Sequence, residues 1–362
     1  MKVIITPVYT GNTHMELLQE ALQSRGLEVR LAPYSGRFPL WQAATQFGRP
    51  DVFHLQWQHR FFTAATPLPA LFKTLRFFLQ WFSLRVRGTR FVWTVHNVVN
   101  HERHQARWEL AACRLLARWV DRVNVHCPSA VPAVATAYKL RPERIQVVPR
   151  VHYAGQYPET SMKAVARQKL GLPTEARLFL SFGMVRPYKG LDRLLAAFAQ
   201  LQNDELRLII MGKPKPAELG RTLAAQAAAD PRVITRFEFI PDDQLSLYLS
   251  ACDLVVLPYA DSLNSGAAVL AATFGRPLLM PKLGCMADYP EAAAITYSPN
   301  EPDGLRLALE KAVLLSLEPM GLAARRFIQQ FSPSLVADQT IAVYQSVLGR
   351  EATAVELWGY EQ

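Results

Sequence analysis

The stretch that decides the fold is LFLSFGMVRPYKGLDRLLAAF, residues 178–198. It opens with a short, mostly apolar run ending at Phe182, which has the length of a buried parallel strand. It closes with Leu191, Leu194 and Phe198, whose spacing matches one face of a helix. A strand followed closely by a helix predicts a β/α unit of a parallel sheet.

The turn between this strand and this helix contains Gly183, Arg186, Pro187, Lys189 and Gly190. A helix start offers unbonded N–H groups and the positive end of the helix dipole. Arginine can bind a phosphate with two parallel hydrogen bonds, and lysine adds a point charge. The turn therefore predicts a site for a phosphate-bearing ligand, and a merely basic, solvated loop is the alternative.

Length and composition favour a packed, two-domain protein. The chain has 362 residues, of which 50% are hydrophobic and 19% charged. No apolar run reaches the roughly 18 residues that a membrane span needs. The opening MKVIITPVYT reads as a first strand and not as a signal peptide, which predicts a cytoplasmic protein. The four cysteines are widely scattered, which excludes a close-spaced zinc framework.

The positive charge is concentrated in one half of the chain. Residues 1–150 contain 20 Lys or Arg and 8 Asp or Glu, a balance of +12, whereas residues 151–362 contain 20 and 22, a balance of −2. A basic half predicts an anionic partner, which could be nucleic acid, a membrane surface or a phosphorylated substrate.

Strands and helices alternate through both halves, with a joint at residues 150–175. The strands expected in the first half are Val3–Ile5, Glu28–Ala32, Asp51–Leu55, Phe91–Val95, Arg122–His126 and Arg144–Val148. Those expected in the second half are Leu178–Phe182, Leu206–Met211, Val233–Glu238, Leu254–Leu257, Pro277–Met280 and Ala294–Thr296. This alternation predicts two Rossmann-like α/β domains with parallel sheets. The first loop lacks G-x-G-x-x-G, so a dinucleotide cofactor is not supported.

Polar side chains follow two expected strands of the first half. Trp57 follows the third strand, and the fourth ends in a cluster of His96, Asn97, His101 and Glu102. Ligands bind at the carboxyl ends of strands in open α/β sheets, so these residues are candidates for substrate binding. A single histidine is more often structural, but the cluster favours a functional role.

A second candidate phosphate contact lies at the start of the helix after Leu254–Leu257. Asn264, Ser265 and Gly266 precede that helix and offer a hydroxyl and backbone donors. A plain N-cap is the alternative reading of these residues.

Residues 67–90 predict a basic, aromatic amphipathic helix. Its expected apolar face comprises Leu71, Leu75, Phe78, Leu79 and Phe82, widened by Phe72, Phe77 and Trp81. Its cations are Lys73, Arg76, Arg85, Arg87 and Arg90. Such a helix can lie in a membrane interface, and a core-facing helix with a solvated basic face is the alternative.

Four segments together resemble the GT-B glycosyltransferases, and most of all glycosyltransferase family 4 (group 1). Residues 183–190 look like the family segment G-x-x-x-x-x-K-G, and residues 251–258 like its "A-D-hydrophobic-P" strand. Residues 270–277 are similar to its "E-A-x-A-x-G-x-P" helix end, and residues 93–97 to the strand of its acceptor domain. The resemblance implies two Rossmann-like domains facing a central cleft.

The resemblance also implies a domain plan and roles for single residues. Residues 1–155 would bind the acceptor, residues 156–335 the nucleotide sugar, and residues 336–362 would form a helix crossing back to the first domain. By resemblance, Arg186 and Lys189 hold the donor diphosphate and His96 lies beside the donor sugar. The chain departs from the family where two glutamates are usual, because Ser262 and Leu270 stand there.

The activity that the resemblance implies is transfer of a hexose from a UDP- or GDP-sugar to a glycan or lipid-linked glycan in exopolysaccharide or cell-surface polysaccharide synthesis. The expected reaction is retaining and needs neither metal nor cofactor, since no D-x-D pair is present. His96, His101 or Glu102 would serve as any general base. The loop from Tyr9 to Asn12 would close over the donor, because Gly11 permits close backbone approach.

We expect the protein to sit on the inner face of the cell membrane, bound to its anionic surface through residues 67–90. Three alternatives remain open at this point. They are a nucleotide-sugar epimerase, a non-catalytic nucleotide-sugar-binding subunit and a basic nucleic-acid-binding protein. No recognised nucleic-acid-binding module is found in the sequence, so a nucleic-acid partner is not expected.

Overall fold

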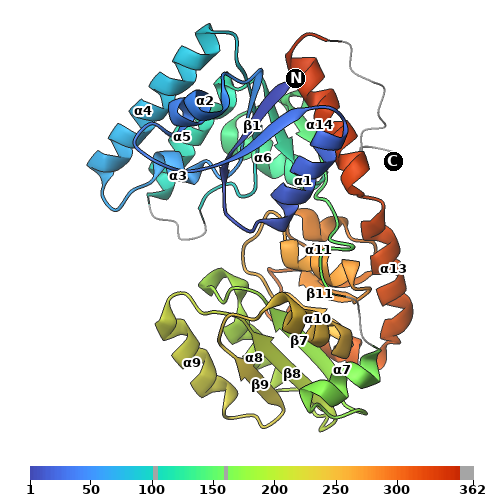
Figure 1. Cartoon of the computed structure of the whole chain (residues 1–362). Helices are drawn as coiled ribbons and strands as arrows, with labels where there is room; N and C mark the ends of the chain where they lie inside the picture. Colours follow the sequence, from blue (N-terminus) through green and yellow to red (C-terminus); the bar gives the residue numbers. More distant parts are fainter. Residues whose placement is uncertain (101–104, 159–161, 351–362) are drawn as a thin grey trace. The chain divides into compact units, whose positions relative to one another are not determined.

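The computed structural model describes residues 1–100, 105–158 and 162–350. The chain divides into two compact units (Figure 1): unit 1 comprises Met1–Val151 and Phe331–Gln362, and unit 2 comprises His152–Gln330. Each unit contains a six-stranded parallel sheet, which confirms the predicted α/β class. The sequence analysis set the domain boundaries after residues 155 and 335, whereas the units divide at residues 151 and 330.

The sheet of unit 1 has the strand order β2-β1-β3-β4-β5-β6. Its strands are β1 (Lys2–Val8), β2 (Glu28–Pro33), β3 (Val52–Leu55), β4 (Arg90–Thr94), β5 (Arg122–Val125) and β6 (Ile145–Val147). Because all neighbours are parallel, the loops that follow β1, β3, β4 and β5 leave from one edge of the sheet. That edge gathers Trp57 and His96, which are far apart in the sequence.

Helices cover both faces of this sheet. They are α1 (Thr13–Ser24), α2 (Pro39–Phe47), α3 (His59–Phe62), α4 (Pro67–Val86), α5 (Ala106–Trp119), α6 (Ala130–Tyr138), the 3-10 helix η1 (Pro142–Arg144) and α14 (Pro333–Val347). Figure 1 shows α1 and α14 side by side. Tyr344 of α14 hydrogen-bonds His54 of β3 on one face, and Trp81 of α4 packs on Phe91 of β4 on the other. The sequence analysis named no helix at residues 39–47.

Helix α4 carries apolar side chains on two opposite faces. Phe77 and Trp81 are buried against the core, with Trp81 5.4 Å from Phe91 between ring centroids. The other face is exposed, and we call its residues the α4 stripe: Leu68, Leu71, Phe72, Leu75, Leu79, Phe82 and Val86. The sequence analysis was wrong to place Phe77 and Trp81 on that same face. In α4 one apolar face packs on the core and the other lies at the surface. The hydrophobicity of the residues alone does not tell which face is which.

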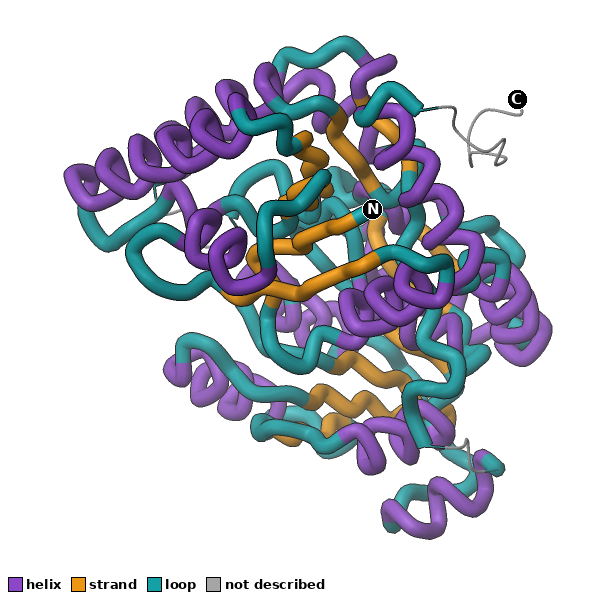
Figure 2. The backbone as a smooth tube through the Cα atoms, turned by 45° about the horizontal axis from the view of Figure 1, so that its top comes forward, coloured by secondary structure: helices purple, strands orange, loops and turns teal. Residues whose placement is uncertain are grey.

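The sheet of unit 2 has the order β12-β11-β10-β7-β8-β9. Its strands are β7 (Arg177–Phe182), β8 (Leu206–Met211), β9 (Val233–Arg236), β10 (Leu254–Val256), β11 (Leu278–Pro281) and β12 (Ala294–Tyr297). Its helices are α7 (Lys163–Leu170), η2 (Pro187–Lys189), α8 (Leu191–Phe198), α9 (Ala217–Ala227), α10 (Asp242–Ala251), α11 (Gly266–Thr273), η3 (Gly284–Asp288), α12 (Gly304–Leu314) and α13 (Leu317–Gln329). Figure 2 shows the alternation of strand and helix by colour.

The core of unit 2 explains the apolar pattern of residues 178–198. Phe179 of β7 and the α8 side chains Leu194 and Phe198 are fully buried in one apolar cluster. The helical spacing in the sequence therefore identified the face of α8 that packs on the sheet. The structure adds the short 3-10 helix η2 between strand and helix, which the sequence analysis had treated as a turn.

Candidate functional site

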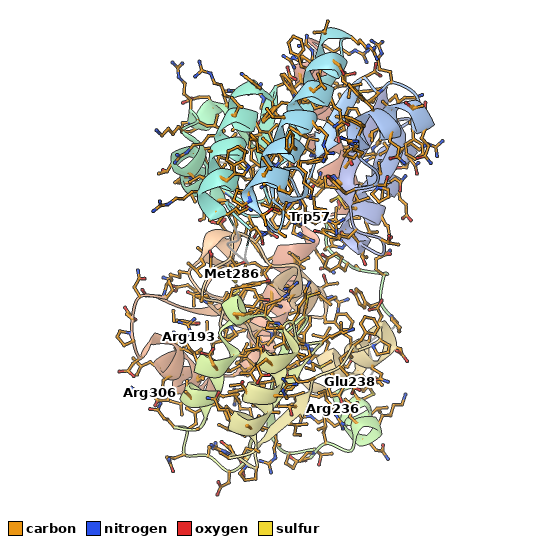
Figure 3. All side chains as sticks on the ribbon, turned by 90° about the vertical axis from the view of Figure 1, so that its left-hand side faces the viewer. Trp57, Arg193, Arg236, Glu238, Met286 and Arg306 are labelled. Carbon is orange, nitrogen blue, oxygen red and sulfur yellow. The ribbon has the colours of Figure 1, made fainter. Side chains whose placement is uncertain are left out.

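The loop after β7 is held by the loop after β8. The Val185 backbone N–H donates to the Lys213 carbonyl at 3.0 Å, and the Lys215 N–H donates to the Val185 carbonyl at 2.9 Å. Gly212 packs so closely that a Cβ there would lie 2.1 Å from the Gly183 carbonyl oxygen. The next strand, β9, ends beside them at Arg236, labelled in Figure 3. These contacts fix the backbone from which the two predicted phosphate-binding cations project.

The same loop is pinned on its other side to the end of β10. Gly190 has φ +63°, and a Cβ there would lie 2.3 Å from the Pro258 carbonyl oxygen, so only glycine fits. The Ala260 N–H donates to the Tyr188 carbonyl at 2.7 Å. Arg186 precedes η2 and is half-buried, with its Nε 3.1 Å from the Met184 sulfur.

Lys189 is buried among aromatic side chains. Its Nζ lies 5.0 Å from the Tyr259 ring centroid, a cation–π distance, and it is hydrogen-bonded to the Tyr259 side chain. Burial lowers the pKa of Lys189, but Tyr259 and Tyr188 raise it by more, so the net pKa lies above its ordinary value. The Tyr259 hydroxyl also lies 3.5 Å from the Ser265 hydroxyl. Tyr259 thus connects the two segments in which the sequence predicted phosphate contacts.

The second segment has the geometry of an N-cap. The Ser265 hydroxyl accepts the Ala268 N–H at 3.1 Å, and Gly266 begins α11. The Asn264 carbonyl accepts the Ser262 hydroxyl at 2.7 Å. The cap geometry leaves the phosphate contact of this segment a prediction.

Leu270 and Ser262 both face inward. They stand where the resembling family has glutamates, and each is less than 9% exposed. Leu270 has no polar side-chain atom, and the Ser262 hydroxyl donates to the Asn264 carbonyl, so neither position supplies a carboxylate.

In unit 1 two histidines form a hydrogen-bonded pair. His96 Nδ1 lies 3.4 Å from His126 Nε2, and His126 Nδ1 lies 3.0 Å from the Val148 carbonyl oxygen. A carbonyl can only accept, so His126 must carry its proton on Nδ1 and present a bare Nε2 to His96. His96 then carries its proton on Nδ1, which leaves its Nε2 as the basic atom. That Nε2 lies 2.7 Å from the Gln56 side-chain oxygen Oε1, and two acceptors cannot bond each other. Turning the Gln56 amide by 180° presents its NH2 instead, a group that otherwise has no hydrogen-bond partner among the described residues.

Burial keeps these histidines neutral. It lowers the pKa of His96 well below its usual value, and His126 and Arg150 lower it further. Burial lowers the pKa of His126 to about 3, and that of His54 to about 3 as well. An uncharged imidazole with a fixed tautomer can accept a proton or hold a hydroxyl group.

Aromatic rings continue outward from His96. Trp57, labelled in Figure 3, stacks on His96 with centroids 4.3 Å apart and planes 7° apart. Tyr9 meets Trp57 edge-on at 5.1 Å, and its hydroxyl lies 3.3 Å from His59 Nε2. The structure therefore brings together two predicted site residues, Trp57 and His96, and sets beside them Tyr9, the first residue of the loop that we expect to close over the donor.

The other predicted site residues of unit 1 have open surroundings or local structural contacts. Gly11 has φ +72° and open space around it. The Asn12 side chain accepts the Met15 N–H and caps α1, so this predicted substrate-binding residue has a structural role at the helix start. The Asn97 carbonyl lies 3.4 Å from the Tyr138 hydroxyl. His101 and Glu102 lie outside the described residues.

Sequence reasoning missed three residues that organise these two edges, namely His126, Tyr188 and Tyr259. Each stands at the end of an expected strand or in the loop after it, so position alone was the available signal. Their roles depend on partners from other strands, which no local pattern shows.

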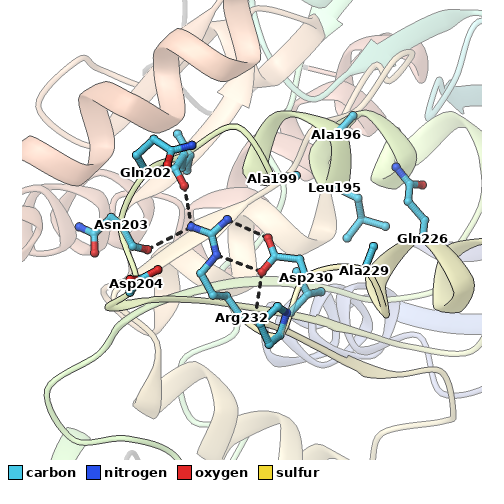
Figure 4. A pocket seen from close by; sticks show the side chains of 13 residues that line it. Leu195, Ala196, Ala199, Gln202, Asn203, Asp204, Gln226, Ala229, Asp230 and Arg232 are labelled. Carbon is cyan, nitrogen blue, oxygen red and sulfur yellow. Dashed lines mark hydrogen bonds and ion pairs between the residues drawn. The ribbon is translucent and has the colours of Figure 1, made fainter.

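A surface hollow of about 660 Å³ in unit 2 is not this site. It lies near the amino ends of β8 and β9, and Figure 4 shows two of its charged side chains, Arg232 and Asp230, paired with each other. The Arg232 guanidinium binds the Asp230 carboxylate at 2.8 Å and 3.0 Å, and it also donates to the Leu201 carbonyl. No charge in that pair is left to recognise a ligand.

No three His, Cys, Asp or Glu side chains among the described residues gather closely enough to hold a metal ion. No helix within the same residues combines the length and apolar character that crossing a bilayer requires.

Comparison with known proteins points to one family. Residues 162–313 match the family model of glycosyl transferases group 1. A GDP-mannose:glycolipid 4-beta-D-mannosyltransferase of Xanthomonas campestris pv. campestris is 30% identical over 269 residues, which cover 74% of this chain and 67% of the relative. A D-inositol 3-phosphate glycosyltransferase of Segniliparus rotundus is 28% identical, covering 65% of this chain and 54% of that protein.

Solved structures share the fold across almost the whole chain. Sucrose-phosphate synthase from Thermosynechococcus elongatus has a TM-score of 0.76 at 17% identity, covering 96% of this chain and 99% of its own. Anabaena HepE in complex with UDP and glucose has a TM-score of 0.73 at 16% identity, covering 96% and 100%. Together with the sequence relatives, these likenesses show that the chain belongs to the group 1 glycosyl transferases and is a glycosyltransferase of the GT-B fold.

Proposed function

We propose that this enzyme transfers a hexose, mannose from GDP-mannose, to a glycolipid acceptor in cell-surface polysaccharide synthesis. The donor and acceptor classes are those in the name of the Xanthomonas relative, which aligns with 74% of this chain. The single observation that carries the proposal is the buried, protonated Lys189 beside Arg186 at the end of β7.

The proposed role of unit 2 is to stabilise the leaving diphosphate. Negative charge grows on the diphosphate as the glycosidic bond breaks, and fixed cations stabilise it most where water is excluded. Lys189 is less than 10% exposed and is held by Tyr259, so its charge does not have to be reoriented during the reaction. Arg186 and the start of α11 at Gly266 supply further donors. With these groups in place, we propose a reaction without metal or cofactor.

The proposed role of unit 1 is to bind the acceptor and take its proton. His96 is neutral, and its Nδ1 contact with His126 leaves Nε2 as the basic atom, next to the Gln56 side-chain amide. The acceptor hydroxyl would lose its proton to this atom as its oxygen bonds to the anomeric carbon. Trp57 offers an aromatic face for the acceptor sugar.

The stereochemical course follows from the product. The resemblance to family 4 implies retention, whereas the relative's name specifies a β-mannosyl product. Making a β-mannoside from α-linked GDP-mannose inverts the anomeric carbon. The anomeric configuration of the purified product, read by NMR, decides between the two courses.

We also propose that the enzyme binds the cytoplasmic membrane surface through the α4 stripe. Six of its seven side chains are more than half exposed, which is unusual for leucine and phenylalanine on a surface. Residues 1–150 are strongly basic, which adds attraction to anionic lipids. A glycolipid acceptor would be met at that surface.

The donor assignment is tested by thermal shift with GDP, UDP, ADP and their sugars. GDP and GDP-mannose should raise the melting temperature most, since a ligand bound only to the folded state stabilises it. Lys189→Ala and Arg186→Ala should each reduce transfer by about a hundredfold with the fold intact. Unchanged turnover in both variants would remove the diphosphate site from this loop.

A further inference from the structure

A row of side chains leads from His96 to a cation that the proposed reaction does not use. His96 stacks on Trp57, and Trp57 meets Tyr9. The Arg60 guanidinium lies over the Tyr9 ring, 4.4 Å from its centroid. Arg60 belongs to α3, directly after the candidate acceptor residues, so the row runs outward from β3 toward α4.

Arg60 is one of three cations that gather around Tyr34. Lys73 of α4 has its Nζ 5.7 Å from the Tyr34 ring centroid and donates to the Thr63 carbonyl at 3.0 Å. Arg76 lies one turn further along α4. Burial lowers the pKa of Lys73, and Arg76 and Arg60 lower it further, so the three positive charges repel one another. All three side chains are half-buried.

These charges have no carboxylate partner among the described residues. Asp121 pairs with Arg85 and Arg90, and Asp338 pairs with Arg25. The Arg76 Nε is buried and makes no hydrogen bond. Half-buried like charges are unfavourable unless an anion joins them, and an unbonded buried donor adds to that cost. The cluster therefore has the chemistry of an anion site.

The position of the cluster on α4 indicates which anion fits. Phe72 and Leu79 lie four residues before and three residues after Arg76, so they share its side of the helix, and each is 55% exposed. An anion bound between Arg60 and Arg76 would have the apolar α4 stripe beside Arg76, and the rings of Tyr9 and Trp57 beside Arg60. A phosphorylated lipid that carries a glycan has parts for all three surfaces.

We propose that Arg60, Lys73 and Arg76 bind the diphosphate of a lipid-linked acceptor. The proposal rests on the proposed function, because it assigns the anchor of that same acceptor. The lipid chain lies along the α4 stripe, and the glycan extends past Tyr9 toward His96. The cations both fix the acceptor's distance from His96 and select acceptors that carry the anionic group.

The test is binding of geranyl diphosphate to the full chain by calorimetry, with saturating GDP present to occupy unit 2. Geraniol and inorganic pyrophosphate are the two comparison ligands. Geranyl diphosphate should bind more tightly than either, because it alone satisfies both the cations and the stripe. Arg76→Gln and Arg60→Gln should each weaken its binding by about tenfold, the value of one lost charge-assisted hydrogen bond.

Two further variants separate charge from folding. Arg76→Lys keeps the charge and should stay within a few-fold of the unmodified protein. Arg30→Gln removes an exposed cation of the edge strand β2 and should change nothing. Equal binding by the Arg60, Arg76 and Arg30 glutamine variants would overturn the site. Pyrophosphate binding as tightly as geranyl diphosphate would overturn its assignment to a lipid.

Failure of the proposed function would look different. In that case GDP would not stabilise the protein and Lys189→Ala would not reduce transfer, whatever the cations of unit 1 do. Intact GDP binding with unaltered acceptor binding in Arg60→Gln and Arg76→Gln would refute the acceptor site alone.

Discussion

Burial disfavours the charged form of both side chains to which we assign most of the chemistry, but only one of them becomes neutral. Lys189 stays charged although it is buried, because Tyr259 and Tyr188 offset the cost of desolvation. His96 is neutral, because burial and its cationic neighbours disfavour the imidazolium. A charged group suits the leaving diphosphate, and a neutral base suits the acceptor hydroxyl.

The histidine pair gives a prediction for one residue. His126→Leu removes the acceptor that holds the His96 proton on Nδ1, so the tautomer of His96 should become mixed. We expect kcat to fall by about tenfold with a smaller change in donor KM, since proton transfer and not donor binding is affected. The pH profile of kcat should shift as well, and nitrogen NMR of His96 reports the tautomer directly.

His126→Gln is the matched control for that variant. Its amide oxygen can replace Nε2 as the acceptor, so it should restore much of the rate and the single tautomer. A His126→Leu enzyme with an unaltered pH profile and an unaltered His96 spectrum would show that His126 is only structural.

Among the elements, α4 combines a buried apolar face, an exposed apolar stripe and a bordering cation. Its buried face, with Phe77 and Trp81, holds it on the sheet of unit 1. Its exposed stripe has spacings of four and three residues, which keep Phe72, Leu75 and Leu79 on one side. Arg76 borders that stripe, so charge and apolar surface adjoin each other.

The stripe predicts membrane binding that two substitutions should weaken. Leu75→Ser with Phe82→Ser removes two exposed apolar side chains, 55% and 62% accessible, without touching the core. Binding to vesicles that contain anionic lipid should fall by about tenfold or more, measured by co-sedimentation. Transfer to a water-soluble acceptor should stay the same.

A matched double variant, Leu307→Ser with Leu322→Ser, tests whether any exposed leucine has this effect. Both residues belong to unit 2 and are 52% and 57% exposed. If this control lost vesicle binding as strongly as the α4 variant, or the α4 variant kept full binding, the stripe would not be the membrane contact.

At the scale of the whole molecule, stability should depend on pH through the buried groups of unit 1. The pKa values of His14, His54, His96 and His126 are all lowered, chiefly by burial. The unfolded chain therefore binds more protons than the folded one below about pH 6.5. The free energy of unfolding should fall as the pH drops from 7 toward 4.

Glu109 opposes that trend. Burial raises the pKa of Glu109 to about 7, so the folded chain holds this proton more tightly and stability falls as pH rises from about 4.5 to 7. Four histidines outweigh one carboxyl, so urea unfolding at pH 7 and pH 5 should show lower stability at pH 5. Glu109→Gln should make the loss on acidification steeper. Greater stability at pH 5 than at pH 7 would contradict this account.

Short sequence patterns predict much of this architecture. The apolar run before Phe182 and the helical spacing after Leu191 identify a strand and a helix, because local periodicity reflects which face is buried. The position of Arg186 and Lys189 between them, and of Trp57 and His96 after other strands, follows from the same patterns. Within each sheet, parallel strands place such loops at one edge, so the location of the candidate sites was predictable.

The partners of these residues emerged only from the folded chain. His96 meets His126 because β4 lies beside β5, and Lys189 meets Tyr259 because β7 lies beside β10. The division of α4 into a buried and an exposed face, likewise, depends on which helices and strands surround it. Strand order and packing depend on contacts between residues far apart in the chain. These contacts decide which side chains stay charged, which histidine nitrogen carries the proton and which apolar surface remains exposed.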